Sequence, residues 1–145
     1  MLEDQEWTST FLQRKKKLMI ECYNTATDFL FKHGILLYDM NAGLFIWVDL
    51  RHLLVSKSSV RNSDYDTLRV MAVDSQRHQQ IELKISDICM KNGVMIAPGH
   101  VYRAEEYGWF RITFTVGREA LDEGLKRLLK SIEEIEAVSD GWKWT

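Results

Sequence analysis

The strongest constraint on the fold is an amphipathic helix expected over residues 118–138. Apolar residues recur at the helical repeat and keep one face of this segment apolar; they are Leu121, Leu125, Leu128, Leu129, Ile132 and Ile135. Acidic residues lie near its start, where the helix dipole favours negative charge. Such a helix needs a second layer against which to bury its apolar face.

Short apolar segments punctuated by turn residues predict that layer. The first two strands are expected to be joined by a tight turn at Asn41–Gly43, and the segments that predict strands are residues 34–39, 44–50, 94–99 and 109–114. Two more helices are expected, one in residues 1–33, with its pattern running from about Asp4 to His33, and one over about residues 74–91. The order α-β-β-α-β-β-α predicts a single α+β domain over residues 1–145, in which helices cover a small mixed or antiparallel sheet, mostly on one side.

Composition excludes several classes of function. The 145 residues are 46% hydrophobic and carry a net charge of −2, so nothing points to nucleic acid or to an anionic membrane surface. No apolar run approaches the roughly 20 residues that a membrane span needs. Cys22 and Cys89 are isolated and have no metal-binding spacing. They indicate reduced core thiols and a cytoplasmic protein.

No catalytic set can be assembled from the sequence. The four histidines are scattered, and no glycine-rich phosphate loop, nucleophile elbow or Cys-x-x-Cys pair is present. Lys57 lies in a polar, serine-rich loop over residues 55–66, where nothing would desolvate its amine and lower its pKa. The residues therefore predict no catalytic group, no metal site and no cofactor-binding lysine.

Arg111 is the one residue that needs a special explanation. It lies inside the strand-like stretch Trp109–Phe114, where alternation places Trp109, Arg111 and Thr113 on one face. Burying an unpaired guanidinium is very costly, so it requires a partner. That partner is either a carboxylate of the protein, such as Asp49 or a nearby glutamate, or the carboxylate of a ligand.

Three blocks of the chain resemble a known enzyme family. "NAGLFIWVDLRHLL" (residues 41–54), "NGVMIAPG" (92–99) and "EYGWFRITFT" (106–115) are similar, in this order, to the C-terminal small domain of 1-aminocyclopropane-1-carboxylate (ACC) synthases and related class I/II aminotransferases. The first helix resembles the long helix that links the two domains of the family, and the last helix resembles its final one. The resemblance covers roughly residues 4–135.

The resemblance implies a role in a pyridoxal-phosphate enzyme of the aminotransferase or carbon–sulfur lyase type. In that family the arginine of the Gly-Trp-Phe-Arg block holds the α-carboxylate of the amino-acid substrate, so Arg111 takes this role, with Ala42 and Gly43 as weaker substrate-binding candidates. The family's cofactor lysine block belongs to the large domain and has no match here. The chain alone is therefore expected to bind no cofactor, although pyridoxal phosphate serves the full-length family.

Three hypotheses about function follow. In the first, the chain is a truncated or split part of such an enzyme and is inactive in that chemistry alone. In the second, it is a partner or regulator that acts on a large domain or an intact homologue, or as a homodimer. In the third, it is a cofactor-independent enzyme on a carboxylate-bearing substrate, with Tyr102, Tyr107 or His100 transferring protons.

Overall fold

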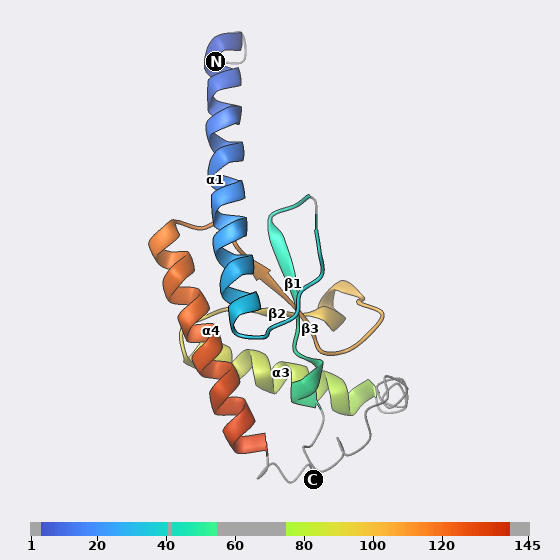
Figure 1. The fold of residues 1–145 in the computed structure, drawn as a ribbon. Coiled ribbons are helices and arrows are strands. Elements are labelled where there is room, and N and C mark those ends of the chain that lie inside the picture. Colours follow the sequence, from blue (N-terminus) through green and yellow to red (C-terminus); the bar gives the residue numbers. More distant parts are fainter. Residues whose placement is uncertain (1–3, 41, 55–74, 140–145) are drawn as a thin grey trace.

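The computed structural model describes residues 4–40, 42–54 and 75–139 (Figure 1). The predicted loop at residues 55–66, Asn41 and the tryptophans Trp142 and Trp144 lie outside these described residues. The regular elements are α1 (Gln5–Lys32), β1 (Phe45–Asp49), η1 (Arg51–Leu54), α3 (Ser75–Lys91), β2 (Ala97–Pro98), η4 (Gly99–Tyr102), β3 (Trp109–Thr113) and α4 (Arg118–Ser139). The three predicted helices and the α+β class are confirmed.

Helix α1 is much longer than the surface it packs on. The Asp4 side chain begins the helix by accepting a 2.9 Å hydrogen bond from the backbone N–H of Trp7. Only the last turns carry buried residues, namely Ala26, Thr27 and Leu30. The N-terminal half extends beyond the rest of the molecule (Figure 1). Against the other described residues, the first helix is thus packed at its C-terminal end.

The sheet has three antiparallel strands in the order β1-β3-β2. The predicted strand at residues 34–39 is wrong, because it is reduced to a single bridge between Leu37 and Val48. The predicted strand at residues 94–99 shortens to Ala97–Pro98. Pro98 has no N–H to donate, which limits how far the ladder with β3 can extend. In the order β1-β3-β2 the central strand is β3, which carries Arg111.

The helices bury one face of the sheet. Ile46 and Val48 on β1 and Phe110 and Ile112 on β3 are buried, and α4 packs against both α1 and α3. In α3 the thiol of Cys89 is fully buried, and burial raises its pKa to about 11. The thiol is therefore neutral at physiological pH, as expected for a core residue. Along both β1 and β3 the alternate residues are less buried and form the opposite, open face of the sheet.

None of the helices within the described ranges is long and apolar enough to cross a lipid bilayer.

Candidate functional site

Arg111 lies at the centre of the open face. It is directly opposite Trp47 on β1 and Ala97 on β2, so a strand flanks it on each side. Its side chain is half-buried, whereas its neighbours Phe110 and Ile112 point into the core. Alternation along β3 thus places the Arg111 side chain on the sheet face that points away from the core, the same face as Trp109, as the sequence predicts.

Aromatic rings surround the Arg111 guanidinium. Its Cζ atom is 4.0 Å from the ring centroid of Phe45 on β1 and 3.7 Å from that of Tyr102 in η4. Its Nη2 donates a hydrogen bond to the hydroxyl of Tyr102, whose ring also contacts Trp47 edge-on at 5.9 Å. These contacts are favourable for a cation, but they bring it no negative charge.

The carboxylates of Asp49 and Glu106 pair with a different arginine, Arg51. Asp49 accepts hydrogen bonds from Nε of Arg51 at 3.0 Å and from its Nη2 at 2.7 Å. Glu106 accepts a third from Nη1 at 2.7 Å. The hydrogen bond with Asp49 is the main cause that raises the pKa of Arg51, and the charges of Asp49 and Glu106 add to it. The internal ion pair that the sequence left open for Arg111 is therefore made by Arg51.

A buried carboxylate fixes the segment that leads into the Arg111 strand. Glu82 on α3 is fully buried, and its Oε1 accepts a 2.6 Å hydrogen bond from the backbone N–H of Gly108. Its Oε2 pairs with Nδ1 of His100 in η4. Glu82 thus anchors both ends of the segment that carries Tyr102. Sequence reasoning missed Glu82, because a glutamate in an amphipathic helix gives no signal that it is buried.

Among the other candidate residues, His100 and Tyr107 have partners other than Arg111. His100 is held by Glu82, and Tyr107 stacks on His78 with ring centroids 5.7 Å apart. Ala42 and Gly43 lie in an exposed turn before β1. This turn leads into Phe45, whose ring contacts the Arg111 guanidinium. Of the tyrosines and histidine proposed for proton transfer, only Tyr102 contacts Arg111.

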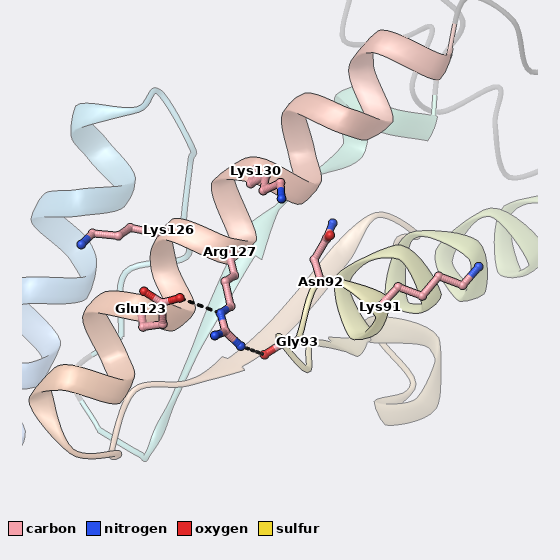
Figure 2. Close-up of a pocket in the computed structure, with 7 residues that line it drawn as sticks. All are labelled: Lys91, Asn92, Gly93, Glu123, Lys126, Arg127 and Lys130. Atoms are coloured by element: carbon pink, nitrogen blue, oxygen red, sulfur yellow. Dashed lines mark hydrogen bonds and ion pairs between the residues drawn. The ribbon is translucent and has the colours of Figure 1, made fainter.

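A separate cavity of about 540 Å³ lies between the end of α3 and α4. Figure 2 shows that its central cation, Arg127, is already used: Nε donates to Glu123 at 2.8 Å and Nη1 to the carbonyl of Gly93 at 3.2 Å. Lys91 and Lys126 extend away from Arg127 in opposite directions (Figure 2). The cavity is a helix-to-turn junction and is formed by elements other than those around Arg111.

Within the part of the chain that the structure describes, no group of three histidine, cysteine, aspartate or glutamate residues could hold a metal ion. The open face presents instead an arginine among aromatic rings.

Known proteins similar to this chain are pyridoxal-phosphate enzymes and ACC synthases. No family model matches the chain. "1-aminocyclopropane-1-carboxylate synthase CMW33" from Cucurbita maxima is 29% identical over 141 residues, which are 97% of this chain and 25% of that protein. "Probable aminotransferase gliI" from Aspergillus fumigatus is 30% identical over 145 residues, all of this chain and 29% of that protein.

A solved structure shares the fold. The "PLP-bound C-S lyase from Staphylococcus hominis" aligns with a TM-score of 0.63 at 21% identity, over 88% of this chain and 28% of the lyase. The chain thus spans about a quarter of the length of the relatives that it matches. These findings confirm the resemblance: over nearly its whole length the chain is similar to part of an ACC synthase and part of a probable aminotransferase, and it shares the fold of part of a C-S lyase.

Proposed function

We propose that this chain supplies the substrate-carboxylate site of an aminotransferase- or ACC synthase-like enzyme, with Arg111 as the residue that binds the α-carboxylate. The names of its relatives indicate enzymes that form amino-acid products or transfer amino groups. Either chemistry requires a group that recognises the carboxylate of an amino acid. On the open face of this chain, that group is Arg111.

The observation that carries the proposal is the contrast between two arginines of similar setting. Arg51 contacts Trp109 with its Cζ 5.1 Å from the ring centroid, and two carboxylates neutralise it. Arg111 has the same kind of aromatic contacts, but no carboxylate of residues 4–40, 42–54 and 75–139 pairs with it. A half-buried cation without a counter-charge favours an external anion.

The pyridoxal-phosphate cofactor does not fit the described residues of this face. Such a cofactor needs a lysine amine, yet the lysines within the described ranges all lie on helices α1, α3 and α4 and none on β1, η4 or β3. In this proposal the chain contributes carboxylate binding, and any carbon–nitrogen or carbon–sulfur chemistry needs groups from another polypeptide segment.

Carboxylate binding can be measured directly on the full chain. We expect acetate, at constant ionic strength, to shift the ¹⁵N–¹H signal of the Arg111 side chain, whereas the isosteric neutral acetamide leaves it unchanged. A single charge-assisted, two-pronged contact predicts a dissociation constant on the order of 10–100 mM. In Arg111→Gln the acetate-dependent shifts of neighbouring signals should vanish, while in Arg103→Gln, which removes the same charge from the adjacent turn, they should persist. Equal acetate shifts in wild type and Arg111→Gln would refute the proposal.

A second candidate, a partner that associates with a larger protein, is favoured by exposed apolar side chains. The unpacked half of α1 exposes Trp7, Phe11, Leu12, Leu18 and Ile20. On the sheet side, Tyr38 is 64% exposed and Met95 is 79% exposed. Surface of this kind is typical of protein contact. Protection of α1 amides from exchange upon addition of a separately produced large domain would support this candidate.

A further inference from the structure

We propose that Tyr102 is a competing internal ligand of Arg111, so that its hydroxyl and a ligand carboxylate compete for Nη2 of the guanidinium. This inference rests on the proposed carboxylate site and adds how access to that site is controlled. It makes Tyr102 a determinant of affinity, in place of the proton-transfer role that the sequence suggested for it.

The geometry of the guanidinium supports competition. A guanidinium offers its two faces to aromatic rings and its N–H edge to hydrogen-bond acceptors. Phe45 and Tyr102 lie within 4.0 Å and 3.7 Å of the Arg111 Cζ, so ring contacts use the faces. The Tyr102 hydroxyl accepts from Nη2, so it occupies part of the edge. Nη2 contributes an N–H to each edge at which a carboxylate can bind in a two-pronged manner, so the Tyr102 hydroxyl competes with a carboxylate for this group.

Tyr102 is also placed so that it can move away. Tyr102 is 41% exposed, in contrast to the buried residues of the opposite sheet face. It lies at the end of η4, and the next residue, Arg103, has a left-handed backbone with φ 57° and ψ 39°. This conformation is common where a helix ends, and the N–H groups of Arg103 and Ala104 donate to the carbonyls of His100 and Gly99.

The base of this turn, by contrast, is fixed. Glu82 binds His100, two residues before Tyr102, and the Gly108 N–H, three residues before Arg111. The backbone that positions the two side chains is therefore held from the core. Displacement then requires only the exposed end of the turn and the Tyr102 side chain to move.

The test compares Tyr102→Phe with wild type in acetate titrations of the full chain, followed by the Arg111 side-chain signal. Phenylalanine keeps the ring contact and removes the competing acceptor, so acetate should bind about three- to tenfold more tightly. Tyr38→Phe is the matched control, because Tyr38 lies on the same side of the sheet, contacts Trp109 and leaves Arg111 untouched. It should bind acetate as wild type does.

The outcomes separate this inference from the proposed function. Binding that depends on Arg111 but is equal or weaker in Tyr102→Phe would overturn competition and leave the carboxylate site standing. No Arg111-dependent binding of acetate in wild type or in Tyr102→Phe would overturn both. Binding detectable only in Tyr102→Phe, and abolished when Arg111→Gln is added, would support both.

Discussion

At the scale of single residues, Glu82 has the largest structural consequence for the open face, although it does not lie on it. It is a fully buried carboxylate with two partners, the Gly108 N–H and His100. Glu82→Ala would leave a buried donor without an acceptor, and we expect the free energy of unfolding to fall by about 3 kcal/mol. Glu82→Gln keeps an acceptor for Gly108 and should cost less. Urea denaturation measures the free energy of unfolding of both variants. Equal losses of stability would show that the hydrogen bond accepted by the residue 82 side chain does not stabilise the fold.

The sequence predicted Arg111 as the central residue of the candidate site but not the side chains that contact it. Arg111 was found because a charge inside an aromatic, β-branched stretch is conspicuous and alternation fixes its face. Asp49, which the sequence offered as a possible partner, pairs instead with Arg51 at the turn into η1. Tyr102 approaches Arg111 through a turn whose path no periodicity encodes. Contacts that depend on a turn or on strand register need the folded chain.

At the scale of elements, the start of β3 depends on a glycine. Gly108 has φ 92°, and a Cβ added there would lie 2.8 Å from Cα of Arg51. Backbone strain and overpacking together predict that Gly108→Ala lowers the free energy of unfolding by about 2–5 kcal/mol. Gly124 in α4 is the matched control, because a Cβ there meets nothing within 4 Å. Gly124→Ala should raise stability by up to about 1 kcal/mol, since alanine suits a helix better. Thermal unfolding of the two variants checks the signs, and a neutral Gly108→Ala would contradict the described packing.

The sequence predicted the long helices more accurately than the short strands. Helices α1, α3 and α4 repeat their apolar pattern over many turns, so their bounds agree with expectation to within a few residues. Residues 34–39 misled the prediction because their apolar letters mimic a strand, yet Leu36 and Tyr38 are exposed and only Leu37 bridges β1. The predicted strand at residues 94–99 was limited by Pro98, which cannot donate to a ladder. A few residues of apolar sequence do not determine whether a segment pairs with a neighbouring strand.

At the scale of the whole molecule, the two halves of α1 differ: its C-terminal half packs against other described elements, whereas its N-terminal half is mostly exposed. Contact with the rest of the chain begins near Cys22 and Tyr23, where the Tyr23 ring meets Phe114 at 5.5 Å. Before that point the side chains are mostly exposed, among them Phe11 and Leu18. A helix without tertiary contacts is marginal in water, so its stability must differ along its length.

Amide hydrogen exchange of the full chain at low concentration should therefore show a gradient along α1. We expect amides from residue 8 to about residue 18 to exchange on the order of a hundredfold faster than those of Ala26–Lys32. Helix α4 is the internal control, because buried residues from Leu121 to Ile135 pack it along most of its length. If the gradient disappears as the protein concentration rises, a second copy covers the exposed half, and association belongs to the function. If protection is uniform even at high dilution, the N-terminal half of α1 is packed within the chain itself, and neither a free surface nor a partner is needed to explain its apolar side chains.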